Sequence, residues 1–440
     1  MRILWFSHSP SLALQALQPG FNVGRSWIES LDLGMKEQKD IQLGVAFNWL
    51  VDEVQEIKIE GHPTEYYAMP RYPKSKWARF YQRWTCQPEP FEKHLPHFLE
   101  VVERFRPDVV HFFGTESMFP LLIPQLKVPA AIWVQGNLTV YHTKWEVSFP
   151  IGKTLRYERW KDILNAETYL HHYRLMGRKA AREASIFRYA QYFTGRTKWD
   201  RRLVATMAPQ AQYFHCEEAM RPVFFQHQWQ LHRHRDHFVM VTTISDNLYK
   251  GLDLVMETTM LLQSLVNKRV EWRVVGIAED NTYVRMCRDK ANCPTSNGLV
   301  KMLGFQPAER LAEELMNADL YVHPSHIENS PNSICEAMLM GVPVVSTNVG
   351  GTPELLVNKE EGLLVHCGDA YAMAGAILEC YHAPERAANM GQRARRRGLQ
   401  RNDLNAIVSS LLEIYNKMLT PNKKPHGSPS LKPAESKLKP

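Results

Sequence analysis

The stretch His326–Gly351, HIENSPNSICEAMLMGVPVVSTNVGG, joins a helix start, an apolar helix and a short apolar strand. Ser330 followed by Pro331 predicts the helix start, because the serine oxygen can cap free amides and proline at the first helical position gives up no hydrogen bond. Gly341 followed by Pro343 predicts the helix end. The run PVVST then predicts a buried strand. This succession is typical of an α/β sheet covered by helices.

Two glutamates, Glu328 and Glu336, lie on either side of this helix start. The amino end of the helix carries unpaired amides and partial positive charge, so we expect it to bind an anion. Glu336 lies roughly 7 Å along the helix at ~1.5 Å per residue. The order carboxylate, anion site, carboxylate matches hexose, diphosphate and ribose in a sugar nucleotide, since each carboxylate can accept hydrogen bonds from two hydroxyls. Taken alone, the pair also fits a solvated loop residue and a glutamate bound by a neighbouring arginine.

On both sides of this segment, short runs rich in Val, Ile and aromatics alternate with longer helical patterns, which predicts parallel sheets with helices on both faces. In the first half we predict strands at residues 2–7, 41–48, 108–113, 130–136 and 191–197, and a hairpin at 54–70. In the second half we predict strands at residues 237–245, 272–277, 299–305, 319–325, 343–347 and 362–365.

The restart of the pattern near Asp236 divides the chain into two doubly wound α/β domains, residues 1–225 and 226–420. The segment 215–237 has no clean period and is predicted to hold the linker. Residues 421–440 are rich in Pro, Lys and Ser and are predicted to form a disordered basic tail, because they carry too little apolar surface to order themselves.

The composition is that of a soluble globular protein, since 44% of the 440 residues are hydrophobic and 22% are charged. No stretch approaches the ~20 apolar residues needed to span a bilayer. Met1 leads directly into RILWFS, which lacks the features of a signal peptide, so we expect a cytoplasmic protein. Seven scattered cysteines show neither zinc nor disulfide spacing and are interpreted as buried thiols: Cys86, Cys216, Cys287, Cys293, Cys335, Cys367 and Cys380.

The formal charge of +7 favours anionic partners such as phosphates or a lipid surface. Nucleic acid is not an expected partner, because the chain has no zinc-finger spacing, no basic region running into heptads and no RNA-binding aromatic signature.

The segment HPSHIENSPNSICEAMLMGVPVVSTNVGGTPELL, residues 323–356, resembles the signature of the retaining family-4 glycosyltransferases of GT-B fold. This family, also called glycosyl transferases group 1, includes many bacterial polysaccharide and lipid-sugar transferases. The resemblance extends upstream through residues 299–325, whereas in the first domain it is limited to fragments, chiefly PDVVHFFG at residues 107–114. It implies an α/β protein with two Rossmann-like domains facing a central cleft, the donor on the second and the acceptor on the first.

By position, the resemblance implies that Glu328 contacts the transferred sugar near its anomeric carbon and that Glu336 contacts the ribose. Lys250, in LYKGLDLV, matches the family lysine that neutralises the leaving phosphates. The backbone amides of three residues at the helix start should lie near the diphosphate, namely Asn332, Ser333 and Ile334.

Three residues of the first domain are further candidates for donor binding. Gly20 and Gly24 follow the first strand and would let the backbone approach a phosphate or an acceptor, although a simple turn explains them equally well. Gln135 stands where the family often has a histidine that faces the transferred sugar. Glutamine can hydrogen-bond a hydroxyl but takes up no proton. His111 is a separate position, which we expect to pack beneath the cleft.

One family feature is missing before Lys250. The family usually has an arginine five or six residues earlier, whereas this chain has Ile244 and Ser245 there. Arg196 and Arg273 are the alternatives for this second phosphate contact, and either could equally be structural.

The implied reaction transfers a glycosyl group, with retention, from a nucleotide sugar to a saccharide or lipid-linked acceptor. A UDP- or GDP-sugar is the expected donor, and neither a metal ion nor another cofactor is expected, because nothing resembles a DxD metal site. The alternatives are a GT-B nucleotide-sugar epimerase, a phosphorylase-like enzyme and a non-catalytic nucleotide-sugar binder.

Two segments, residues 71–84 and 149–160, interleave basic and aromatic residues. This composition fits peripheral association with the inner face of the cell membrane. Solvated helix faces with their aromatic side chains packed inward fit it equally well.

Overall fold

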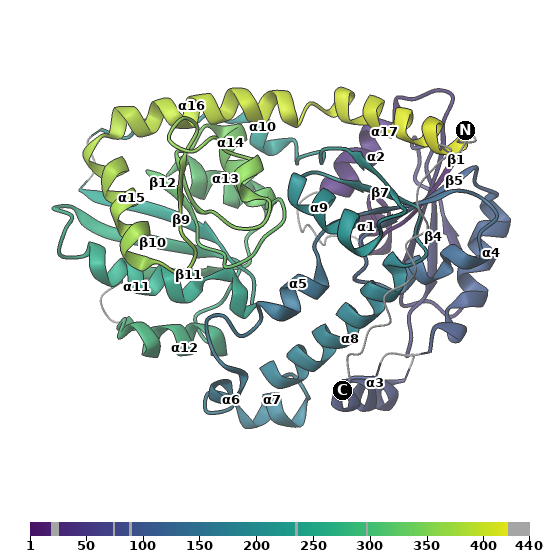
Figure 1. The fold of residues 1–440 in the computed structure, drawn as a ribbon, viewed down its shortest axis with the longest axis horizontal. Coiled ribbons are helices and arrows are strands. Elements are labelled where there is room, and N and C mark those ends of the chain that lie inside the picture. The colour runs from purple at the N-terminus through teal and green to yellow at the C-terminus, as the bar shows by residue number, and fades with distance from the viewer. Residues whose placement is uncertain (19–25, 74, 88–89, 234–235, 296–297, 421–440) are drawn as a thin grey trace.

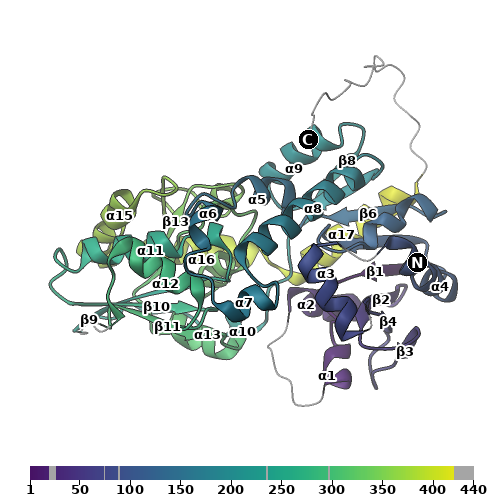
Figure 2. The ribbon, with the colours of Figure 1, turned by 90° about the horizontal axis from the view of Figure 1, so that it is seen from below.

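The computed structural model describes residues 1–18, 26–73, 75–87, 90–233, 236–295 and 298–420 (Figure 1). Gly20, Gly24 and the tail 421–440 lie outside the described residues. Two helix-covered sheets lie at opposite ends of an elongated molecule (Figures 1 and 2). The predicted α/β architecture of two Rossmann-like domains is therefore confirmed.

The first sheet contains the predicted strands and the predicted hairpin. Its strands are β1 (Arg2–Phe6), β2 (Gln42–Trp49), β3 (Gln55–Ile57), β4 (Glu65–Pro70), β5 (Val109–Phe113), β6 (Ala130–Trp133), β7 (Tyr192–Gly195) and β8 (Gln212–His215). They are ordered β3-β4-β2-β1-β5-β6-β7-β8, and only the hairpin pair β3–β4 is antiparallel. The edge strand β8 was not predicted, because QYFH is short and half exposed and gives no apolar run.

The second sheet is parallel throughout the described residues. Its strands are β9 (His237–Thr243), β10 (Arg269–Val275), β11 (Val300–Gly304), β12 (Leu320–His323), β13 (Val344–Thr347) and β14 (Leu363–Val365). Their order is β11-β10-β9-β12-β13-β14, so the direction of strand addition reverses between β9 and β12. All six correspond to predicted strands.

Strand β1 shows why a strand in a sheet covered on both faces has a continuous run of apolar residues in its sequence. Ile3 and Trp5 belong to the core on one face, and Leu4 and Phe6 belong to the core on the other. Successive side chains point to opposite faces, so all four are buried.

The helices of the first half are α1 (Ala13–Leu17), α2 (Trp27–Lys36), α3 (Lys76–Thr85), α4 (Leu95–Phe105), α5 (Leu138–Thr143), α6 (Ile151–Thr154), α7 (Trp160–Leu164), α8 (Tyr169–Phe187), α9 (Lys198–Met207) and α10 (Val223–Gln226). Those of the second half are α11 (Leu252–Leu262), α12 (Thr282–Ala291), α13 (Ala308–Met316), α14 (Asn332–Met340), α15 (Ala370–His382), α16 (Pro384–Arg401) and α17 (Leu404–Leu419).

Helix α17 belongs in sequence to the segment 226–420 but packs on the first sheet. Figure 1 shows α16 and α17 running along one side of the molecule from the second sheet to the first. The Tyr415 hydroxyl accepts a hydrogen bond from Trp5 Nε1 over 3.0 Å and lies 2.7 Å from His111 Nδ1. Burial lowers the pKa of His111 to about 3, so His111 is a neutral residue of this core, packed as expected.

None of the described helices is long and apolar enough to cross a membrane. Six of the cysteines are buried, as predicted, but Cys367 is exposed. That prediction was wrong for Cys367 because it lies in the loop after β14, where its thiol is 3.2 Å from His326 Nδ1.

Candidate active site

The candidate site lies where the strand order of the second sheet reverses, between β9 and β12. In open α/β sheets, ligands bind outside the carboxyl ends of the strands at such a switch point. The chain leaves β9 into the turn that carries Lys250, and it leaves β12 into the loop that carries Glu328. The topology therefore brings together two residues that are distant in sequence.

Glu328 and Lys250 form an ion pair. The Lys250 ammonium donates to Glu328 Oε2, and the Tyr141 hydroxyl on α5 donates to Oε1 over 3.4 Å. Glu328 is only 8% exposed. Burial acts to raise its pKa, but Lys250 and the neighbouring His323 hold the pKa of Glu328 below its ordinary value. The carboxylate is therefore ionised and buried, which excludes the alternative of a solvated loop residue.

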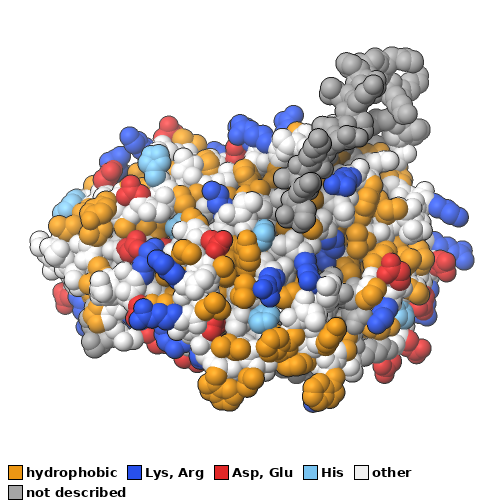
Figure 3. All heavy atoms as spheres, turned by 60° about the horizontal axis from the view of Figure 1, so that its bottom comes forward, with side chains coloured by type: hydrophobic (Ala, Val, Ile, Leu, Met, Phe, Trp, Pro, Cys, Tyr) orange, Lys and Arg blue, Asp and Glu red, His pale blue; other side chains and the backbone are white. Residues whose placement is uncertain are grey.

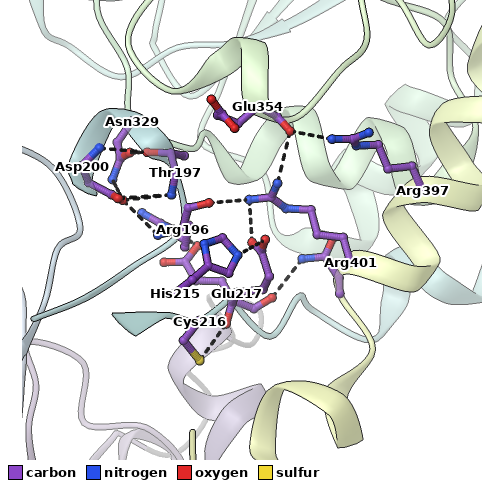
Figure 4. A network of polar contacts seen from close by, with 12 residues as sticks. Arg196, Thr197, Asp200, His215, Cys216, Glu217, Asn329, Glu354, Arg397 and Arg401 are labelled. Carbon is purple, nitrogen blue, oxygen red and sulfur yellow. Dashed lines mark hydrogen bonds and ion pairs between the residues drawn. The ribbon is translucent and has the colours of Figure 1, made fainter. Parts of the chain in front are cut away.

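The loop around Glu328 is held from both domains. Asn329 Oδ1 accepts a hydrogen bond from Thr197 Oγ1 over 2.9 Å (Figure 4). Asn329 Nδ2 also donates to the Gln135 carbonyl over 3.2 Å. On the other side, His326 Nε2 lies 3.0 Å from Asp253 Oδ1 on α11. These contacts fix the position of the carboxylate between the two domains.

The His326–Asp253 contact is a charged pair. Burial alone would lower the pKa of His326, but its hydrogen bonds to Asp253 and Cys367 and the charge of Asp253 raise this pKa to about 9. Burial likewise opposes ionisation of Asp253, yet His326 and Lys290 lower its pKa to about 2. Both groups are charged at neutral pH.

Neither candidate for the missing family arginine is available to a phosphate in this arrangement. The Arg196 guanidinium pairs with Glu218, and both side chains are almost fully buried. Figure 4 places Arg196 inside an interdomain network in which Arg401 donates to the Arg196 carbonyl over 3.3 Å. Arg273 pairs with Glu271 and with Glu314, at 2.7 and 2.9 Å. Both arginines have structural partners.

Helix α14 begins one residue later than predicted. Its N-cap is Pro331, and no side chain caps its first turn, so the predicted cap by Ser330 is wrong. The Ile334 amide donates to the Pro331 carbonyl over 3.0 Å, so this predicted diphosphate contact already has a partner. The amides of Asn332 and Ser333 remain at the uncapped positive end of the helix. The predicted end at Gly341, with φ of +81°, is present.

Glu336, the predicted ribose ligand, is 4% exposed and is bound by Arg221, whose Nε donates to Oε1 over 3.1 Å. Burial raises the pKa of Glu336, and the charge of Arg221 offsets only part of that effect. Arg221 also lies over the ring of Phe224, 4.8 Å from its centroid. The alternative of a glutamate bound by an arginine thus describes this contact, and the ribose contact stays a prediction.

The first domain contributes the ends of β5 and β6. Gln135 Nε2 is buried and has no hydrogen-bond partner among the described residues. Glu116 Oε2 is also buried and unpartnered there, and it lies so close to Gly114 that a Cβ at Gly114 would be 1.9 Å away. Only glycine fits at this position, where φ is +88°. One atom of each of these two side chains, Gln135 Nε2 and Glu116 Oε2, thus has no hydrogen-bond partner among the described residues.

Three site residues were missed by sequence analysis, namely Tyr141, Arg221 and Asn329. The contacts of Tyr141 with Glu328 and of Arg221 with Glu336 cross 187 and 115 positions of the chain. Local patterns carry no signal for such contacts, and Arg221 lies in the segment without a clean period.

Comparisons with known proteins agree with this geometry. Residues 225–397 match the family model of glycosyl transferases group 1. The amylovoran biosynthesis glycosyltransferase AmsK of Erwinia amylovora is 30% identical over 138 residues, 29% of this chain and 32% of the relative. The N-acetyl-alpha-D-glucosaminyl L-malate synthase of Bacillus anthracis is 34% identical over 124 residues, 28% of this chain and 32% of the relative. The matched segment spans about a third of the length of these relatives.

Solved structures extend the likeness to both domains. The sucrose-phosphate synthase from Thermosynechococcus elongatus has a TM-score of 0.68 and 15% identity, covering 95% of this chain and 98% of that one. Anabaena Alr3699/HepE in complex with UDP and glucose has a TM-score of 0.60 and 17% identity, covering 95% and 100%. This chain therefore has the GT-B fold, and its residues 225–397 match the family model of glycosyl transferases group 1.

Proposed function

We propose that the protein is a retaining glycosyltransferase, which moves a sugar from a nucleotide-sugar donor to an acceptor hydroxyl in the synthesis of a polysaccharide, glycolipid or other glycoconjugate. The observation that carries this proposal is the Lys250–Glu328 pair beside the amino end of α14, at the switch point of the second sheet. The family match covers the same residues and supports it.

The arrangement around α14 suits a UDP- or GDP-sugar. The Lys250 ammonium has three donors, so it can bind leaving phosphates while it stays bound to Glu328. The uncapped first turn of α14 offers amides and partial positive charge to a diphosphate. Glu336 keeps acceptor capacity beside Arg221, which allows hydrogen bonds from ribose hydroxyls.

In the proposed reaction, charge develops at two places as the bond to the leaving group breaks. The anomeric carbon becomes positive, and ionised Glu328 stabilises it. The departing diphosphate becomes negative, and Lys250 together with the α14 dipole stabilises it. Closure of the two domains excludes water, so hydrolysis does not compete with transfer.

We propose that catalysis needs no metal ion, because Lys250 and α14 supply the positive charge that a cation would supply. Thermal unfolding with UDP-, GDP- and ADP-sugars identifies the donor, since a bound ligand raises the midpoint. A transfer assay with that donor should keep its rate in excess EDTA. Activity that is lost in EDTA and restored by manganese would contradict metal independence.

Two exposed helices support peripheral association with a membrane, where a lipid-linked acceptor would be presented. Trp77 and Tyr81 on α3 are 82% and 68% exposed, and Trp160 on α7 is 66% exposed. The alternative of aromatic side chains packed inward is therefore wrong for these residues. Hydrophobic side chains gather beside Lys and Arg side chains on the face shown in Figure 3.

These two helices are joined to one another. The Trp84 indole on α3 donates to the Leu164 carbonyl on α7 over 3.1 Å, and Arg83 pairs with Glu167. Helix α3, KWARFYQRWT, carries three basic residues and no acidic residue. Exposed aromatic rings with basic neighbours are the composition that binds an anionic bilayer surface.

A further inference from the structure

A large cavity lies at the switch point of the first sheet, where the strand order reverses between β1 and β5. Its volume is about 810 Å³. His8 follows β1, Glu116 follows β5, and Lys179 and Arg182 on α8 complete the inner wall. The carboxyl ends of parallel strands at a switch point are where α/β sheets bind ligands.

Lys179 and Arg182 share this wall with Glu116. The other acids of the cavity lining already have partners, namely Glu158, Asp162, Glu167 and Asp246. Lys179 is half-buried, and within the described part of the chain it forms neither a hydrogen bond nor an ion pair. Arg182 donates to the carbonyls of Thr115 and Glu116, over 3.2 and 2.6 Å, and its Nε is buried without a partner among the described residues. Two positively charged side chains therefore line the cavity, and the Lys179 ammonium has no partner among the described residues.

Lys179 and Arg182 lie three residues apart on α8, so their side chains are neighbours on one helix face and their charges repel one another. Burial, followed by the charges of Lys179 and Arg182, lowers the pKa of His8 to about 4. Burial and the charge of Arg182 also lower the pKa of Lys179. An anion bound among them would relieve this repulsion and use the free donors.

Two acids, Glu116 and Glu183, lie close enough to attract this positive charge. Glu183 accepts hydrogen bonds from Thr115, Asn137 and Thr139 and is committed to them. Burial, with the charge of Glu183, raises the pKa of Glu116 to about 7, so Glu116 is only partly ionised at neutral pH.

The cavity is electrostatically connected to the candidate site. Burial is the main reason that the pKa of Tyr141 is raised, and the charges of Glu328 and Glu116 add to it. Tyr141 therefore lies within reach of both carboxylates, and its hydroxyl donates to Glu328. Glu116 lines the cavity and lies, with Gln135, beside Gly114, and the Gln135 carbonyl accepts a hydrogen bond from Asn329, the neighbour of Glu328.

We propose that this cavity binds the acceptor through a phosphate group at Lys179 and Arg182, and that the hydroxyl which receives the sugar lies toward Glu116 and Gln135. This assignment rests on the proposed glycosyl transfer. A point charge beside a guanidinium fork is the combination that suits a phosphate. Lipid-linked phosphates and soluble sugar phosphates share this chemistry.

The test is calorimetric titration of the full chain with inorganic phosphate. All proteins carry Lys250→Gln, which reduces binding at the proposed donor site. Adding Lys179→Gln should weaken phosphate binding at least about tenfold, the effect of losing a charged hydrogen-bond donor. The matched control adds Arg174→Gln, an exposed residue of α8 outside the cavity, and should leave the affinity unchanged. Equal affinities in the two proteins would overturn the proposal.

Arg182→Lys is a second variant, because it keeps the positive charge but loses the guanidinium fork. It should also weaken phosphate binding, and unchanged binding would remove Arg182 from the site. Flotation with anionic phosphatidylglycerol vesicles separates the two sources of phosphate. Lys179→Gln should float as the Arg174→Gln control does, and a loss of flotation with unchanged phosphate affinity would assign Lys179 to the bilayer and overturn the cavity site.

The donor provides a check that separates this inference from the proposed function. Without the Lys250 change, Lys179→Gln should be stabilised by a nucleotide sugar as strongly as the Arg174→Gln control. If the donor stabilises both and their phosphate affinities are equal, only the acceptor site fails. If no nucleotide sugar binds any of the proteins, the glycosyl transfer itself fails.

Discussion

Glu328 and Lys250 are the two residues to which the proposed chemistry assigns direct roles, and they form an ion pair. The buried Glu328 carboxylate and the half-buried Lys250 ammonium depend on each other, because removing one partner leaves the remaining charge uncompensated. Tyr141 donates a hydrogen bond to Glu328 from the first domain, so the Glu328 carboxylate has all of its hydrogen-bond donors only when both domains are in place. The pair therefore connects the electrostatics of the site with the arrangement of the domains.

Glu328→Ala and Lys250→Ala should each lower kcat/KM at least about 100-fold, ~2.7 kcal/mol, because each removes charge that stabilises the transition state. Steady-state kinetics with the identified donor measures this. Lys417→Ala, on the exposed face of α17, is the control and should leave kcat/KM unchanged. A loss of less than about threefold, ~0.7 kcal/mol, for either site variant would end the assigned roles.

The His326–Asp253 pair makes stability depend on pH. The folded pKa of His326, about 9, lies above the ordinary value of 6.5, so its contribution is fully present below pH 6.5 and is lost as pH rises toward 9. The loss should approach ~3 kcal/mol. Thermal unfolding of His326→Gln should show a smaller decline over this pH range than the wild type.

The control for this prediction is His382→Gln, an exposed histidine at the end of α15. It should follow the wild-type pH dependence. The same decline in His326→Gln as in the wild type would mean that the histidine is not charged in the folded protein.

Among the helices, α14 and α3 have proposed roles. The amino end of α14 is the proposed diphosphate site, and the exposed face of α3 is the proposed membrane contact. Helix α14 is otherwise a buried helix of the second core, and its uncapped first turn is the part that faces the loop of Glu328. Helix α3 has no buried residue at all. Because α3 buries none of its side chains, its aromatic surface is not explained by packing in the core of the protein.

Trp77→Ser combined with Tyr81→Ser should reduce flotation with phosphatidylglycerol vesicles at least about tenfold. Each substitution removes apolar surface that the bilayer would bury. Phe305→Ser combined with Tyr371→Ser removes two aromatic residues of the second domain that are 64% and 78% exposed, and it is the matched control. Absence of flotation in the wild type, or equal flotation of both double variants, would argue for a soluble acceptor.

The elements show which features the sequence could predict. WRVVGI and DVVHFF are apolar runs long enough to mark buried parallel strands, and both form strands. β8 is missed because QYFH lies half exposed at the sheet edge. The cap of α14 is mispredicted because the N-cap position falls on Pro331, which has no side-chain acceptor, and Ser330 is a buried residue of the preceding loop. A local run of apolar residues therefore predicts which strands are buried, but it does not predict which hydrogen bonds a side chain such as Ser330 makes.

At the scale of the whole molecule, the site exists only because two sheets are joined in a fixed way. Helix α17 returns to the first sheet, and the network of Figure 4 connects Asn329, Arg401 and Arg196 across the domains. The resemblance of residues 323–356 indicated the second domain's site residues. The Arg221–Glu336 pair and the basic cavity depend on contacts between distant segments, so no local sequence signal marked them.

The proposed function requires that the amino end of α14 binds the diphosphate of a nucleotide sugar between Glu328 and Glu336. A crystal structure with the donor bound tests this most directly. We predict diphosphate oxygens within hydrogen-bond distance of the Asn332 and Ser333 amides and of the Lys250 ammonium, with the ribose at Glu336. A nucleotide bound away from the start of α14 would contradict the proposed donor site.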